Sequence, residues 1–268
     1  MAALRHKDKT DGRMSLADHL RELRRRLVIS ALAIAAGSVL GWTQYDRLFT
    51  AIMAPLREVA AQRHGLVNIN FGGITQPFTV QLQMSFFLGV IVASPVWLYQ
   101  VWGFIVPGLT KREKRTSMVF ISAAVPLFLL GCFLATRAVR RAVEVLLGFT
   151  PAGAANLPDA ALYLNFVTRF ILAFGLAFLL PVFLVGLNVA HVLPARLMLK
   201  GWRIAVMLIF VFAAVMTPTP DAWTMLALAL PMIGLFFAAV GVATLLDKKR
   251  SRREPDWTKV PDDEASQL

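Results

Sequence analysis

The chain has 268 residues, of which 57% are hydrophobic and only 16% are charged, and its mean hydropathy is +0.62. Soluble domains carry about 25% charged residues, so this composition excludes an ordinary soluble domain and indicates an integral membrane protein. The net charge of +12 comes from basic residues that flank the apolar stretches, which favours anionic lipid over nucleic acid as their partner.

The N-terminal region predicts a cytoplasmic tail followed by an amphipathic helix that runs into the first span. Residues 1–14 are polar and basic without periodicity, and Ser15 begins a capping box with Asp18. Residues 19–27, HLRELRRRL, then place four arginines and one acid directly before an uncharged run. A basic cluster that enters an apolar helix is typical of the cytoplasmic end of a span, and we expect that span at about residues 23–42.

The uncharged gaps between charged residues predict six spans within a membrane domain of residues 15–246. After the first span, we expect the others at about residues 78–102, 116–136, 168–188, 203–216 and 222–245. Six spans place both ends of the chain on one side, and three quarters of the 28 Lys and Arg residues fall on that side. By the positive-inside rule, both termini are cytoplasmic. Residues 247–268 are charged and contain proline, which predicts a disordered cytoplasmic tail.

The fifth predicted span is short. Residues 204–216 cover roughly 20 Å at about 1.5 Å per residue, against a hydrocarbon core of about 30 Å. Thr-Pro-Thr-Pro at 217–220 then breaks the helix; the alternative is that the helix continues through the prolines to Asp221. The long outer loops, 43–77 and 137–165, predict a folded cap on the outer face.

The sequence contains no motif of a hydrolase, a nucleotide-binding protein or a metal site. The single cysteine, Cys132, excludes an internal disulfide, and the four histidines follow no ligand spacing. We therefore expect no enzymatic activity, no catalytic residue, no metal and no cofactor. The predicted spans are almost free of ionisable residues, so functional charges are expected at the ends of the spans.

Two carboxylates on the predicted cytoplasmic side, Glu22 and Glu113, are candidate binding groups. One interpretation is local pairing, such as Glu22 with Arg26 four residues later, and surface pairs of this kind contribute less than about 1 kcal/mol. The other is that both carboxylates receive guanidinium groups from a partner, since Arg binds a carboxylate through a planar fork that Lys cannot reproduce. Asp221, at the predicted outer tip, has its own simple interpretation as a turn residue or a helix N-cap.

Four stretches resemble the TatC family, the multi-span subunit of the twin-arginine protein translocase. They are residues 19–27, Ala54-Pro55-Leu56, SPVWLYQVWGFIVPGLTKRE at 94–113, and Thr-Pro-Thr-Pro-Asp at 217–221. The third stretch is the longest and most specific, whereas the fourth carries one residue more than the family pattern. The resemblance implies an all-α, cup-shaped bundle of six transmembrane helices with short fifth and sixth helices.

The resemblance also implies a function. The chain would be the core subunit of the twin-arginine translocase and the receptor for twin-arginine signal peptides, exporting folded proteins across the cytoplasmic membrane with the proton-motive force. Its partners would be these signal peptides, single-span subunits of the TatA and TatB type, membrane lipids and further copies of itself.

Site residues follow from the same resemblance. Glu22 and Glu113 would receive the signal peptide, and the same recognition surface would include Leu20, Arg24, Phe104 and Pro107. Pro55 and Asp221 would be outer-face positions that export requires.

The chain departs from the family pattern in its fourth predicted span. A membrane-embedded Glu is common in the family where this chain has Leu179, and Gln81 or Gln83 of the second span is the alternative group for contacting a partner helix. A different class of function also remains open, a polytopic secondary transporter of a small solute. That function predicts inverted repeats, interrupted helices and polar sites at the middle of the membrane. An intramembrane enzyme is a third possibility, for which the chain lacks a plausible nucleophile.

Overall fold

The structure, a computed structural model, describes residues 16–62, 70–105, 111–148, 158–189, 192–216 and 222–251. Within these ranges it consists of helices joined by turns and short irregular segments, with one isolated β-bridge between Asn70 and Asp159. The helices, in chain order, are α1 (Leu16–Thr43), α2 (Tyr45–Gln62), α3 (Gln76–Val92), α4 (Ser94–Ile105), α5 (Lys111–Gly148), α6 (Ala160–Val189), α7 (Ala195–Lys200), α8 (Trp202–Met216) and α9 (Ala222–Ser251). The predicted all-α architecture is confirmed.

Four of the described helices, α1, α5, α6 and α9, are long and apolar enough to cross a membrane. Helices α3 and α4 together make a fifth candidate, but they are bent by 62° relative to each other. The stretch predicted as a span at 78–102 is therefore two helices, because the chain turns at Ala93 between them, and whether they cross the membrane as one span stays a prediction. Helix α8 has 15 residues and ends at Met216, where the predicted fifth span ends, whereas residues 217–221 lie outside the described residues.

Several helices extend beyond the predicted spans. Helix α5 continues past residue 136 to Gly148, α6 begins at Ala160 rather than at 168, and α9 runs to Ser251, so residues 247–251 are helical. The reason is that a charged residue marks where a helix leaves the bilayer, which is not where the helix ends. The remaining residues of the two predicted tails lie outside the described residues.

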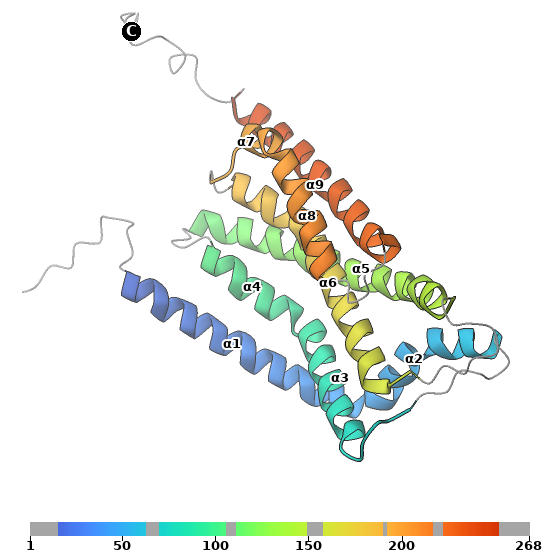
Figure 1. Ribbon diagram of the computed structural model, residues 1–268. Coiled ribbons are helices and arrows are strands. Elements are labelled where there is room, and N and C mark those ends of the chain that lie inside the picture. Colours follow the sequence, from blue (N-terminus) through green and yellow to red (C-terminus); the bar gives the residue numbers. More distant parts are fainter. Residues whose placement is uncertain are drawn as a thin grey trace, which may run out of the picture. The chain divides into compact units, whose positions relative to one another are not determined.

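The chain divides into two compact units, one of residues 1–126 and 155–168 and one of residues 127–154 and 169–268. In the first unit, α1 packs along α3 and α4 (Figure 1). Glycines make the contact with α3 close: a Cβ on Gly41 would lie 2.5 Å from the carbonyl oxygen of Ser85, and one on Gly37 would lie 2.9 Å from that of Gly89. Helices in a membrane associate through such close packing, since lipid offers no hydrophobic driving force between them.

The predicted amphipathic piece of the first outer loop is α2. Its Ile52, Leu56 and Val59 are buried, and Tyr163 of α6 donates its hydroxyl hydrogen to the carbonyl oxygen of Ile52 at 3.0 Å. Pro55 lies inside α2 and is half-buried. The apolar face of α2 therefore packs inside the first unit.

A polar corner joins the segment before α3 to the start of α6. The backbone N–H of Asn70 donates to the carbonyl of Pro158 at 3.1 Å, and that of Ala160 donates to the carbonyl of Asn70 at 2.8 Å. The side-chain amide of Gln76 donates to both carboxylate oxygens of Asp159, at 2.8 and 2.7 Å. These donors, Gln76 above all and then the backbone N–H of Leu162, lower the pKa of Asp159.

In the second unit, α8 packs along α9 (Figure 1). Asp247, near the end of α9, accepts hydrogen bonds from the side-chain amide of Asn188 at 3.0 Å and from the backbone N–H of Ala195 at 2.9 Å. Through these two bonds, α9 is fixed to the end of α6 and the first residue of α7.

We predict that Gly41→Ala destabilises the protein, because its methyl group would push α1 away from α3. The melting temperature of the purified protein in detergent should fall by several degrees. Gly241→Ala in α9 is the matched control: no atom lies within 4 Å of its added Cβ, and Ala favours a helix by about 1 kcal/mol over Gly. An equal change in melting temperature in the two variants would contradict the close α1–α3 contact.

We also predict that the corner at Asp159 loses stability in acid. The pKa of Asp159 is lower in the folded state than in the unfolded state, so its contribution is complete above the unfolded pKa and is lost as the pH falls through the folded pKa. The melting temperature of the native protein should exceed that of Asp159→Asn at pH 6, and the difference should shrink at pH 3. A difference that does not change with pH would contradict this assignment.

Candidate functional site

The beginning of α1 and the end of α4 form the candidate site, and both belong to the first unit. Helix α1 packs along α4, which brings residues 19–26 next to residues 100–104 (Figure 1). These are the two stretches that carry the family resemblance most clearly. The structure therefore brings together segments that are far apart in the sequence.

Glu22 is paired with Arg26 on the same helix. The Nε and Nη2 atoms of Arg26 both donate to Oε1 of Glu22, at 2.9 and 2.5 Å. The two side chains are only 23% and 21% exposed. The other carboxylate oxygen, Oε2, is buried and has no hydrogen-bond partner among the described residues. The local pairing that the sequence offered as one interpretation of Glu22 is thus what the structure shows.

Arg26 is also held by α4. Its Nη1 atom lies 3.5 Å from the carbonyl oxygen of Gln100. A Cβ on Gly103 would collide with the guanidinium group of Arg26, so the absence of a side chain at this position makes room for it. Arg21 and Asp18 make a contrasting pair on the same helix: they lie 3.6 Å apart with side chains 82% and 60% exposed. That pair contributes little, whereas the Glu22–Arg26 pair is part of the contact between two helices.

His19 and Phe104 form a second contact between the same helices. Their rings are stacked, with centroids 4.5 Å apart and an angle of 21° between the planes. Of the other predicted site residues on α1, Leu20 is 63% exposed and Arg24 is exposed. Leu20 and Arg24 are therefore accessible beside a fixed pair of aromatic rings.

Three predicted site residues cannot be placed in this arrangement. Pro107 and Asp221 lie outside the described residues. Glu113 lies on α5, but its side chain is likewise outside what the structure describes. Their roles stay predictions.

A polar cluster within the first unit links α3 to α6. The side-chain amide of Gln83 donates to Oδ1 of Asn165 at 2.8 Å and lies 3.4 Å from the hydroxyl of Thr168. Sequence reasoning named Gln83 as a group for a partner helix and placed Asn165 in a loop. Gln83 instead has partners within its own chain.

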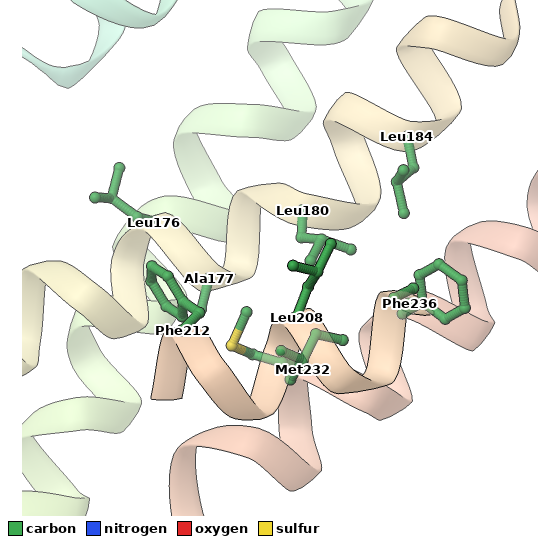
Figure 2. Close-up of a pocket in the computed structure, with 10 residues that line it drawn as sticks. Leu176, Ala177, Leu180, Leu184, Leu208, Phe212, Met232 and Phe236 are labelled. Carbon is green, nitrogen blue, oxygen red and sulfur yellow. The ribbon is translucent and has the colours of Figure 1, made fainter. Parts of the chain in front are cut away.

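The second unit contains an apolar groove of about 350 Å³ between α6, α8 and α9. Figure 2 shows side chains from these helices around it, among them Leu180, Leu208 and Met232. Leu179, where the family resemblance implies a Glu, is 2% exposed. The groove offers apolar contacts and no charged group. Among the described residues, no three His, Cys, Asp or Glu side chains gather as a metal site requires.

Comparison with known proteins decides the family. A family model for the Sec-independent protein translocase protein (TatC) matches residues 18–231 of the chain. The chain belongs to the TatC family. A protein of that name from Xylanimonas cellulosilytica is 47% identical over 241 residues, which cover 90% of this chain and 87% of the relative. Another from Frankia casuarinae is 38% identical over 269 residues, covering 96% of this chain and 74% of the relative.

Solved structures agree with the sequence relatives. The crystal structure of the twin-arginine translocase receptor TatC in the detergent DDM superposes with a TM-score of 0.73 at 31% identity, covering 84% of this chain and 99% of that one. A second crystal structure of this receptor gives a TM-score of 0.72 at the same identity. The TatC fold predicted from the sequence is confirmed, and the chain is a multi-pass membrane component of a protein translocase.

We predict that Gln83→Leu destabilises the first unit, because it leaves Asn165 without its donor. Interhelical hydrogen bonds in membrane proteins contribute about 0.6 kcal/mol on average. A double-mutant cycle with Asn165→Ala, measured by unfolding in detergent, should give a coupling energy of about this size. Gln81→Leu on the same helix is the matched control and should show no coupling to Asn165.

Proposed function

We propose that this chain is the receptor for twin-arginine signal peptides and the core subunit of the translocase that exports folded proteins. The observation that carries the proposal is Glu22, a half-buried carboxylate surrounded by basic residues where α1 meets α4. Membership of the TatC family and the likeness to structures described as twin-arginine translocase receptors support it.

The chemistry of the site suits a peptide that carries paired arginines. A carboxylate accepts a guanidinium through two parallel hydrogen bonds, and this geometry distinguishes Arg from Lys. Glu22 would bind one arginine of the peptide and Glu113 the other. The other contacts of the peptide would come from the remaining residues of the predicted surface, namely Leu20, Arg24, Phe104 and Pro107.

The proposal includes a topology. The chain would cross the cytoplasmic membrane six times, with α3 and α4 as one bent span, α8 as a short one, and both termini in the cytoplasm. The distribution of Lys and Arg supports this orientation. Pro55 of α2 and Asp221 would then lie towards the outer face, where we propose that export requires them.

The proposed partners are single-span subunits of the TatA and TatB type, lipids and further copies of the chain. Export would be driven by the proton-motive force, without enzymatic activity or a cofactor in this subunit. Leu179 cannot offer a polar group to a partner helix, and Gln83 already has partners within the chain. Gln81 of α3 would then be the polar group left for contacting a partner helix, and the other contacts would be apolar.

A secondary transporter of a small solute is the alternative function. Such a transporter would need polar groups facing a cavity near the middle of the membrane. The groove between α6, α8 and α9 is lined by apolar side chains, which favours the receptor over the transporter.

We predict that Glu113→Gln weakens capture of a twin-arginine peptide by tenfold or more, and that Glu22→Gln also weakens it. Loss of one charge-assisted hydrogen-bonded pair costs about 1.5–3 kcal/mol, and 1.4 kcal/mol corresponds to a factor of ten. The measurement is site-specific crosslinking of a labelled peptide to the protein in membranes. Glu144→Gln is the matched control, since Glu144 lies on α5 and pairs with Arg141. Undiminished capture by the double variant of Glu22 and Glu113 would overturn the proposal.

A further inference from the structure

Both oxygens of Glu22 are closed to an incoming ligand. Oε1 accepts two hydrogen bonds from Arg26, and Oε2 is buried. We infer that Arg26 is an internal guanidinium that occupies Glu22 in the free receptor and has to leave before an arginine of the signal peptide binds. The inference rests on the proposed function and adds a means of regulating the same site.

The position of Arg26 is built into the packing of the two helices. The carbonyl oxygen of Gln100 lies near one end of its guanidinium group, and the missing side chain of Gly103 makes space for it. The side chain of Arg26 is only 21% exposed, in contrast to that of Arg21 at 82%. A solvent-exposed ion pair on the surface of one helix would have none of these features.

Because Arg26 already occupies Glu22, a peptide arginine gains less free energy when it binds there. A peptide arginine that takes the place of Arg26 exchanges one guanidinium–carboxylate pair for another of the same chemistry, so the exchange is nearly balanced. The apparent affinity is then reduced by the fraction of receptors in which Glu22 is free. Binding energy from the second carboxylate and from apolar contacts has to drive the exchange.

The same exchange does not change the preference for arginine over lysine. Displacing Arg26 costs the same free energy whichever cation replaces it, so twin-arginine and twin-lysine peptides lose affinity by the same factor. An arginine then regains two guanidinium hydrogen bonds, whereas a lysine regains only the contact of a compact ammonium group. Arg26 therefore lowers the affinity for every cationic ligand, and the difference between arginine and lysine comes from Glu22.

The test measures the affinity of labelled twin-arginine and twin-lysine peptides for the purified full-length protein in lipid nanodiscs. Arg26→Gln should bind the twin-arginine peptide about three- to tenfold more tightly than the native protein. Its affinity for the twin-lysine peptide should rise by a similar factor, so that the ratio of the two affinities stays about the same. Arg26→Lys, which retains the charge but loses the fork, should lie between the native protein and Arg26→Gln.

Gly103→Ala tests the position of Arg26 without changing any charge. Its methyl group would displace the guanidinium group, since the three atoms nearest to it all belong to Arg26. This variant should also bind the twin-arginine peptide more tightly. Arg21→Gln is the matched control for charge, because it removes one positive charge from the same helix and leaves Glu22 and Arg26 intact.

Two results would overturn the inference. One is an Arg26→Gln variant that binds the twin-arginine peptide equally or more weakly, which would make Arg26 a purely structural residue. The other is an equal gain in Arg21→Gln, which would make the effect one of net charge. Glu22→Gln separates the inference from the proposed function: unchanged binding in this variant would overturn both, whereas weakened binding without a gain in Arg26→Gln would overturn the inference alone.

Discussion

The close contact between α1 and α3 is the constraint on which the first unit depends. Lipid tails are as apolar as the helix surfaces, so association relies on packing, and glycines permit the backbones to approach. Gly41 meets Ser85 and Gly37 meets Gly89. Because α1 is one continuous helix from Leu16 to Thr43, its contact with α3 also fixes the position of its first turns against α4. The geometry at Glu22 is therefore a consequence of glycine packing farther along the same helix.

Glycine has a second role at the site itself. At Gly41 it allows backbone to meet backbone, whereas at Gly103 it leaves space that a charged side chain occupies. The space is filled by Arg26, which also approaches the carbonyl of Gln100 and pairs with Glu22. Oε2 of Glu22 stays buried without a partner among the described residues, and an unmet acceptor of this kind costs about 1–3 kcal/mol. Among the described residues, the site thus contains one buried acceptor without a hydrogen bond, next to groups that are hydrogen-bonded.

The sequence predicted the features that depend on the residues of one helix alone. It predicted the apolar helices and the i,i+4 pairing of Glu22 with Arg26 as one of two interpretations. It misplaced several helix ends, because uncharged gaps measure the bilayer rather than the helix: Arg169 lies within α6 and is exposed. The contacts between helices could not be predicted from the sequence. No spacing rule connects His19 with Phe104, or Arg26 with Gly103, since both contacts depend on how α1 lies against α4.

The two interpretations of Glu22, local pairing and receipt of a guanidinium, are not exclusive. They describe one carboxylate with two successive partners of the same chemistry, one internal and one from the ligand. A half-buried carboxylate without an internal partner would bind every cationic ligand more tightly. An internal arginine lowers all of these affinities by the same factor, so it sets a threshold that a ligand has to exceed, whereas the difference in affinity between arginine and lysine comes from the guanidinium fork. The basic cytoplasmic face that we propose raises this threshold further, since it repels a cationic peptide at long range. Recognition then depends on ligand contacts that form together, which is a requirement that a paired-arginine motif meets and an isolated cation does not.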